Sequence, residues 1–203
     1  MGAVLDIEYE KYFSAWNIQV LNLYGLTETA GALTELFPHK AGTIGRLSPA
    51  NKMKLIEGEL TVKGDSVMSG YYGNSEETEK VLRDGWLFTG DLVKVDSDGF
   101  LYLTGRKKNV IILSNGENVS PEGLEIKLYR IKLIQEVIVT GENGILEAEI
   151  YLGDGNSLEE QREVEKQIEK MNRELPRYQQ IRKIVFRDLP FPKTGNGKIR
   201  RLS

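Results

Sequence analysis

Lys198 lies on a short glycine-flanked loop near the end of the chain, in the segment FPKTGNGKIRR. Gly195 and Gly197 give the backbone conformational freedom, and a lysine ammonium is a compact charge with three hydrogen-bond donors. Such a lysine suits the placement of a cation on a phosphate or carboxylate better than it suits packing. An ordinary exposed lysine is the alternative, so the loop gains weight only from three other segments of the chain.

The first of these segments runs from Tyr24 to Thr29 and combines an aromatic ring, a glycine, two hydroxyls and a carboxylate in six residues. Such a set can stack a base on Tyr24, bond a phosphate through Thr27 and hold a magnesium ion with Glu28. The alternative is a plain connection from a strand to a helix, with Thr27 or Thr29 as the cap.

The second segment places Thr89, Gly90 and Asp91 inside an apolar strand pair. A carboxylate there is costly to bury unless something bonds it, and the two adjacent hydroxyls of a ribose are a natural partner. An aspartate that closes a β-turn is the alternative. Arg106 follows the partner strand and would bring a guanidinium to the same site, or it is a surface residue at a domain edge.

The third segment, Ser114 to Asn118, is typical of a tight turn before a helix. Its Gly116 would allow a ligand to pass close to the backbone, although a turn alone explains the pattern. His39 is interpreted as an ordinary loop residue.

Composition excludes several classes of function. The chain has 203 residues, 28% of them charged, with a net charge of −3, one histidine and no cysteine. An acidic chain of this kind is not expected to bind nucleic acid as its main role. Thiol chemistry and disulfides are excluded, and a zinc centre or histidine-dependent triad is not expected. Neither a signal peptide nor a membrane-spanning apolar run is evident, so the expected location is the cytoplasm.

Periodicity predicts an α+β fold in two parts. In the first part we expect helical spacing over 6–16, a short strand over 18–23, strands within 53–68, a helix opened by Asn74, and a hairpin of 86–95 with 100–105. In the second part we expect a strand at 110–113, a helix opened by Ser120 and Pro121, strands at 135–140, 145–152 and 183–187, and a helix opened by a capping box at Ser157. The predicted domains are 1–105 and 110–203, joined by a hinge at 106–109.

Taken together and in this order, the segments resemble the carboxyl-terminal part of the AMP-forming acyl-CoA synthetase superfamily, which also contains luciferases and the adenylation domains of peptide synthetases. The matching pieces cover nearly all of the chain from Asn22 to Arg200. They are NLYGLTE, GELTVKGDSVMSGYY, DGWLFTGDL, DGFLYLTGRKKNVI, SNGENVSPEGLE and PKTGNGK. The run GRKKNVIILSNGENVSPE is most similar to long-chain fatty acid-CoA ligases. The resemblance implies the β-rich end of the large adenylate-forming domain, followed by a small mobile α+β domain.

The resemblance also implies a two-step reaction. A carboxylate attacks the α-phosphate of ATP to give acyl-adenylate and pyrophosphate, and a thiol, usually that of CoA, then takes the acyl group. By resemblance, Tyr24 would stack on adenine with Asn22 near its amino edge, and Thr27 would contact the α-phosphate. Glu28 would ligate Mg²⁺, and Asp91 would bind both ribose hydroxyls.

Four further residues take roles from the same resemblance. Arg106 would lie beside Asp91, and Lys198 would bridge the carboxylate and the phosphate during adenylation. Lys108 matches the hinge position about which the small domain rotates between the half-reactions. In the second orientation the loop with Gly116 would line the approach of the thiol, and Lys198 would lie far from the site.

The sequence departs from the family pattern in having no Ser/Thr/Gly-rich phosphate loop with its lysine. The chain is therefore expected to be the carboxyl-terminal portion of a ligase and, alone, not to adenylate a fatty acid. The alternatives are a stand-alone non-catalytic module that binds a nucleotide or a partner, and an adenylation domain that loads a carrier protein.

Overall fold

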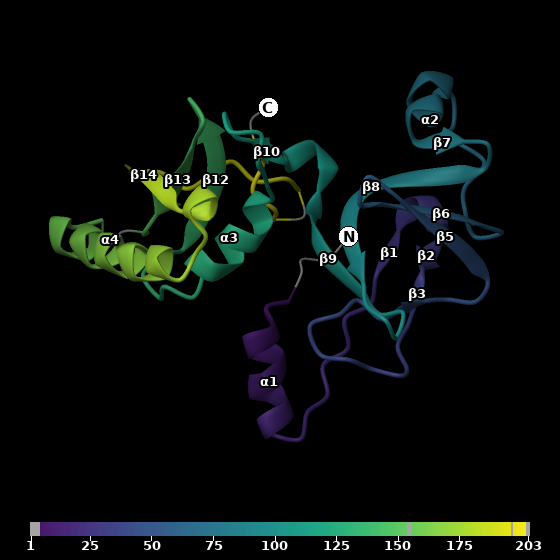
Figure 1. The fold of residues 1–203 in the computed structure, drawn as a ribbon, viewed down its shortest axis with the longest axis horizontal. Coiled ribbons are helices and arrows are strands. Elements are labelled where there is room, and N and C mark those ends of the chain that lie inside the picture. The colour runs from purple at the N-terminus through teal and green to yellow at the C-terminus, as the bar shows by residue number, and fades with distance from the viewer. Residues whose placement is uncertain (1–4, 154–155, 196, 202–203) are drawn as a thin grey trace. The chain divides into compact units, whose positions relative to one another are not determined.

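The chain divides into two compact units, Met1–Lys108 and Asn109–Ser203, called here the amino-terminal and carboxyl-terminal units. The computed structural model describes residues 5–153, 156–195 and 197–201. Figure 1 colours the amino-terminal unit from purple to teal and the carboxyl-terminal unit from teal to yellow.

The amino-terminal unit is built mainly of antiparallel strands. They are β1 (Gly25–Leu26), β2 (Gly31–Ala32), β3 (Thr34–Glu35), β4 (Arg46–Leu47), β5 (Asn51–Ile56), β6 (Glu59–Gly64), β7 (Leu82–Arg83), β8 (Trp86–Val95) and β9 (Leu101–Arg106). The largest sheet has the order β5-β6-β8-β7, and β9 also pairs with β8. The expected hairpin of β8 and β9 and the strands within 53–68 are confirmed.

Two helices accompany these strands, α1 (Ile7–Ala15) and α2 (Ser75–Val81). Asn74 caps α2 as expected, because its side chain accepts a hydrogen bond from the amide of Glu77. α1 is confirmed too, but its one buried residue is Glu10. The expected strand at 18–23 is wrong: this segment has no regular secondary structure and is paired with no strand in the described part of the chain.

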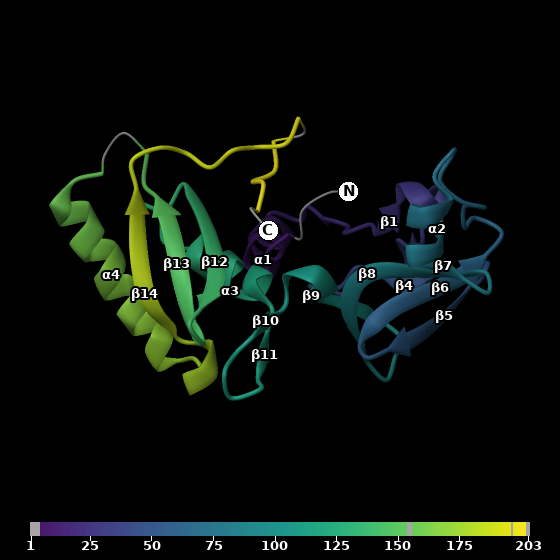
Figure 2. The same cartoon turned by 90° about the horizontal axis from the view of Figure 1, so that it is seen from above.

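The carboxyl-terminal unit is a three-stranded sheet with two helices. Its elements are β10 (Ile111–Ile112), β11 (Asn118–Val119), α3 (Pro121–Leu128), β12 (Glu136–Glu142), β13 (Ile145–Tyr151), α4 (Leu158–Arg173) and β14 (Ile181–Arg187). The strand order is β12-β13-β14, with β12 antiparallel and β14 parallel to β13. A parallel neighbour requires a crossover, and α4 supplies it, lying alongside the sheet in Figure 2.

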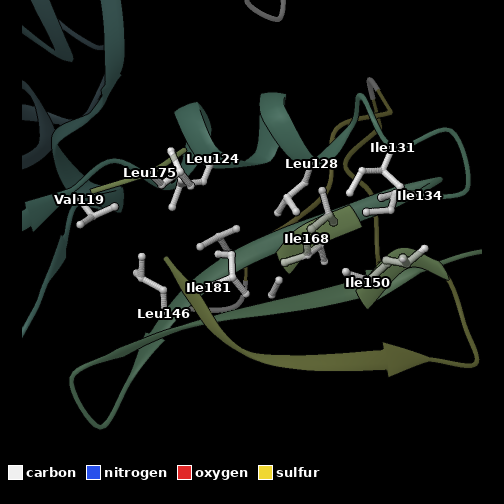
Figure 3. Close-up of a cluster of buried hydrophobic side chains, with 14 of the residues drawn as sticks. Val119, Leu124, Leu128, Ile131, Ile134, Leu146, Ile150, Ile168, Leu175 and Ile181 are labelled. Atoms are coloured by element: carbon white, nitrogen blue, oxygen red, sulfur yellow. The ribbon is translucent and has the colours of Figure 1, made fainter. Parts of the chain in front are cut away.

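One cluster of buried side chains holds this unit together. Leu124 and Leu128 of α3, Ile168 of α4, and Leu146 and Ile150 of β13 all belong to it (Figure 3). The predicted capping box of α4 is confirmed, with the Ser157 side chain accepting from the Glu160 amide. Across the described residues, no helix combines the length and apolar character needed to cross a membrane.

Candidate functional site

Tyr24 is fixed in the amino-terminal unit by its backbone. Its amide donates to the hydroxyl of Thr34 at 3.1 Å, and its carbonyl accepts from the amide of Leu33 at 2.8 Å. The next residue, Gly25, faces the backbone of Gly31 in the β1–β2 pair so closely that a Cβ would overlap it. Glycine is therefore required at this position, because the chain beside Tyr24 turns back on itself without space for a side chain.

The Tyr24 hydroxyl donates to Asp91 Oδ2 at 2.6 Å, although the two residues are 67 positions apart in sequence. Asp91 is 1% exposed and lies on the buried face of β8, where a carboxylate needs partners. Arg106 provides a second one, with Nε 2.7 Å from Asp91 Oδ1, and its guanidinium also donates to the carbonyl of Thr89 at 3.2 Å. The structure thus brings Tyr24, Asp91 and Arg106 together.

The electrostatics of this group follow from burial. Burial, together with the adjacent negative charge of Asp91, raises the pKa of the Tyr24 phenol far above its ordinary value, so it stays a donor at neutral pH. Arg106 is less enclosed, with 28% of its side chain exposed. The group therefore places a buried carboxylate between the Tyr24 phenol and the Arg106 guanidinium, and the guanidinium is the more exposed of these two partners.

Thr27 and Glu28 begin a short 3₁₀ helix directly after β1. The carbonyl of Glu28 accepts from the amide of Met68 at 2.8 Å, and its Oε1 accepts from the hydroxyl of Tyr71 at 2.8 Å. Thr27 is exposed and Glu28 is half-buried. The described residues hold no group of three or more histidines, aspartates or glutamates able to bind a metal. One carboxylate nevertheless fits Mg²⁺ whose other ligands are phosphate oxygens and water.

The residues on both sides of Lys108 make polar contacts within their own units. Lys107 binds Glu59 of its own unit at 2.9 Å, and Glu59 is 4% exposed. Asn109 donates to Glu122 of the carboxyl-terminal unit at 2.5 Å. Lys108 lies between these two anchors and is exposed. Gly116, with φ +83°, lies in the turn where its amide donates to the carbonyl of Leu113, and nothing fills the space beside its Cα.

Lys198 lies on a narrow hairpin of the carboxyl-terminal unit. Lys193 and Ile199 form an antiparallel bridge, and Thr194 donates its amide to the carbonyl of Lys198 at 2.8 Å. The Lys198 amide donates in turn to the hydroxyl of Thr194 at 3.2 Å. Gly197 has φ +79°, and both it and Lys198 are exposed. The remaining expected site residue, Asn22, is half-buried just before Tyr24.

Two family models match this sequence. The AMP-binding enzyme model matches residues 1–72, and the model of the AMP-binding enzyme C-terminal domain matches residues 108–203. The chain belongs to the AMP-binding enzymes, as a carboxyl-terminal portion of an AMP-forming acyl-CoA synthetase.

Named AMP-binding enzymes are similar over much of the chain. A long-chain-fatty-acid–CoA ligase of Mycobacterium bovis, FadD15, is 40% identical over 70% of this chain and 24% of its own length. FadD13 of Mycobacterium tuberculosis, also a long-chain-fatty-acid–CoA ligase, is 32% identical over 98% of this chain and 42% of its own. The chain therefore spans between a quarter and about two fifths of these relatives.

A solved coenzyme A synthetase shares the fold. The O-succinylbenzoate coenzyme A synthetase MenE of Bacillus subtilis, in complex with ATP and magnesium ion, aligns with a TM-score of 0.80. The identity is 26%, and the alignment covers 98% of this chain and 44% of MenE. This likeness bears out the expected α+β fold of an adenylate-forming enzyme.

Sequence reasoning missed the residues that hold the candidate site residues in place. Tyr71 bonds Glu28, and Glu59 and Glu122 anchor the neighbours of Lys108. Glu125 and Glu136 bind the two arms of the Lys198 hairpin. A signal was available for Glu59 and Glu136, because each is a lone glutamate that opens an apolar strand pattern, where a carboxylate needs a specific partner.

Proposed function

We propose that this chain supplies the ribose-binding carboxylate, the metal-binding carboxylate and the mobile lysine of an AMP-forming acyl-CoA ligase. The observation that carries the proposal is the convergence of Tyr24, Asp91 and Arg106 around one buried carboxylate, in a chain whose relatives include named fatty-acid–CoA ligases. In this reaction an oxygen of the acid attacks the α-phosphorus of ATP, and pyrophosphate leaves. The thiol of CoA then attacks the acyl carbon, and AMP leaves.

Asp91 is proposed to accept hydrogen bonds from the ribose hydroxyls, because each carboxylate oxygen can accept more than one hydrogen bond. Asn22 and Tyr24 would border the adenine; the Tyr24 ring is 4% exposed, so stacking requires that the ring first be uncovered. Thr27, exposed at the start of the 3₁₀ helix, would donate its hydroxyl to the α-phosphate. Bound Mg²⁺ would be held by Glu28 and would offset phosphate charge.

Lys198 is proposed to place its ammonium between the acid and the α-phosphate, where negative charge gathers in the transition state. Lys108 is proposed as the hinge. The anchors on Lys107 and Asn109 support this assignment, because they leave Lys108 as the residue between two fixed ends. The loop with Gly116 would line the path of the thiol. The acid is proposed to be a fatty acid and the acceptor CoA.

Replacement of Lys198 tests the proposal in the full-length enzyme. Lys198→Ala should lower acid-dependent ATP–pyrophosphate exchange by about 10²–10³-fold, the usual effect of removing one transition-state donor. Thioester formation from preformed acyl-adenylate should be unchanged. Lys166→Ala, at an exposed lysine of α4, is the control and should affect neither step. Equal loss of both half-reactions in Lys198→Ala would contradict the assignment.

The acid and the acceptor are tested separately. Exchange should be faster with palmitate than with octanoate or acetate, and CoA should be acylated without any carrier protein. A preference for acetate, or acylation of a carrier protein alone, would overturn these parts of the proposal and leave the role of Lys198 intact.

A further inference from the structure

The Lys198 hairpin is short. In the described residues its arms are joined by the bridge between Lys193 and Ile199 and by backbone hydrogen bonds of Thr194 with Lys198 and of Arg200 with Pro192, and Lys198 is exposed. A short isolated hairpin is marginally stable in water, so the direction of Lys198 depends on what fixes the two arms that lead into and out of the loop. Both arms end in contacts to buried or half-buried glutamates of the carboxyl-terminal unit.

Glu136, the first residue of β12, fixes the incoming arm at two points. Its Oε2 accepts the amide of Phe191 at 2.7 Å, and its Oε1 lies 2.6 Å from Lys193 Nζ. Glu136 is 8% exposed. Burial alone would raise the pKa of this carboxyl, but the Lys193 ammonium and the Phe191 amide outweigh it and the pKa lies below its ordinary value. Glu136 is therefore charged at neutral pH and uses both oxygens to hold the arm.

Glu125 of α3 fixes the outgoing arm. Both of its oxygens lie 2.5 Å from Arg201 Nη2, and Arg201 Nη1 donates to the carbonyl of Val139 at 3.2 Å. Glu125 also accepts the amide of Val139 at 2.7 Å. Because Glu136 and Val139 both belong to β12, the same strand contacts the incoming arm and the outgoing arm. The described contacts of the two glutamates reach the loop through Lys193, Phe191 and Arg201 and not through Lys198 itself.

We infer that Glu136 and Glu125 are positioning residues that aim Lys198 during adenylation. This inference rests on the proposed role of Lys198. A reacting group that is displaced by about 1 Å can lose 10²-fold in rate, so release of either arm would lower the rate although neither glutamate touches a substrate. When the carboxyl-terminal unit takes the orientation for thiol transfer, Lys198 is not used, and the glutamates should not affect that step.

The test compares Glu136→Gln with a matched control in the same sheet. Glu147 of β13 is 7% exposed and lies 2.6 Å from Lys183 Nζ, but the described contacts do not link it to the lysine hairpin. Glu136→Gln should lower ATP–pyrophosphate exchange in the full-length enzyme about tenfold and leave thioester formation from preformed acyl-adenylate within twofold. Glu147→Gln should leave the rates of both steps within twofold of the unmodified enzyme. The two variants are compared at equal thermal stability.

Lys193 supplies the conservative rescue. Lys193→Gln should share the adenylation loss of Glu136→Gln, and the double variant should lose little more, because both changes break the same ion pair. Lys193→Arg keeps a cation on Glu136 and should retain exchange activity. Arg201→Met should give the same selective loss through the outgoing arm.

The outcomes separate this inference from the proposed function. If Lys198→Ala leaves exchange intact, the proposed role of Lys198 fails. If Lys198→Ala abolishes exchange but Glu136→Gln and Arg201→Met do not lower it, only the positioning role fails. Loss of both half-reactions in Glu136→Gln but not in Glu147→Gln would also overturn it, because the effect would then be on folding rather than on the direction of Lys198.

Discussion

At the scale of single residues, the site depends on how one buried carboxylate is satisfied. Asp91 shares the inward face of β8 with Leu87 and Val93, a position where the alternation of the strand predicts an apolar side chain. It is stable there because Tyr24, from the segment before β1, and Arg106, at the end of β9, supply donors. A carboxylate oxygen can accept more than one hydrogen bond, and the proposed role of Asp91 toward a ribose diol depends on this property.

Removal of the Tyr24 hydroxyl should show how much its hydrogen bond to Asp91 contributes to the stability of the fold. Tyr24→Phe should lower the free energy of unfolding by about 1.5–3 kcal/mol, the range for a hydrogen bond to a charged group. Asp91→Asn should cost more, because it also leaves Arg106 without its anion, although the 28% exposure of Arg106 limits the effect. Urea unfolding of the chain provides the measurement. Tyr72→Phe, at a fully exposed tyrosine, should change nothing. Equal stabilities for all variants would contradict the account.

The sequence identified residues able to take part in chemistry better than it identified the residues with which they interact. Sequence reasoning selected Tyr24, Asp91 and Arg106 and expected Arg106 beside Asp91, but it assigned Tyr24 to a nucleotide and did not foresee its hydrogen bond to Asp91. Pairing between positions 67 apart depends on the register of β8 and on the β1–β2 turn, which no local pattern encodes. The roles of these residues toward a nucleotide stay predictions.

At the scale of elements, the β8–β9 hairpin sets the position of Asp91 opposite Arg106. Its turn is organised by Asp96, whose Oδ1 accepts the amides of Asp98 and Phe100 at 3.0 and 2.9 Å. Lys40 Nζ lies 2.6 Å from Asp96 Oδ2 and links the turn to a distant loop. The Asp-Gly signal correctly predicted the turn, whereas the lysine could not be found from local sequence.

The turn should therefore depend on pH. The Lys40 ammonium, aided by the two backbone amides, lowers the pKa of Asp96 from 3.8 to about 2. Because the folded pKa is depressed, the contribution of Asp96 to stability is present above pH 3.8 and is lost as the pH falls through about 2. NMR titration of the Asp96 carboxyl should show this midpoint, and Lys40→Met should move it upward. An unchanged midpoint in Lys40→Met would show that the amides alone set it.

Elements with strong local signals were predicted well, and the exceptions have physical causes. The helices α2 and α4 follow from their caps, and the long strands follow from periodicity. In α3 the proline at the start is as expected, but the side chain of Ser120 makes no capping hydrogen bond. The strand expected at 18–23 is absent because a strand needs a partner, and partners are a tertiary property. Helical spacing correctly placed α1, but it did not indicate which face of the helix is buried, and the aromatic residues of this segment are exposed. Instead Glu10 faces inward, where it lies 2.7 Å from His39 and accepts the amide of Gly42.

At the scale of the whole molecule, the chain has two separate hydrophobic cores. One is centred on residues such as Leu60 and Leu101 and the other on Leu128 and Ile168. Each unit therefore has what a domain needs to fold by itself.

The two units should unfold separately. Leu128→Ala should destabilise the carboxyl-terminal unit by about 2–5 kcal/mol, as usual for a buried leucine. Both tryptophans, Trp16 and Trp86, lie in the amino-terminal unit, so their fluorescence should be unaffected while circular dichroism shows an earlier transition. Leu60→Ala should do the reverse and shift the fluorescence transition. A fluorescence shift in Leu128→Ala would mean that the units unfold as one cooperative body.

The edge of the carboxyl-terminal sheet has a consequence for solubility. β12 has β13 on one side and no other strand in the described part of the chain, so its outer backbone groups are a template for pairing with another molecule. At Val139 both groups are occupied, the amide by Glu125 and the carbonyl by Arg201. The arm that carries the lysine hairpin therefore also shields this edge. A protease that removed the arm would expose a strand able to recruit a second copy, and self-association would follow the loss of Arg201.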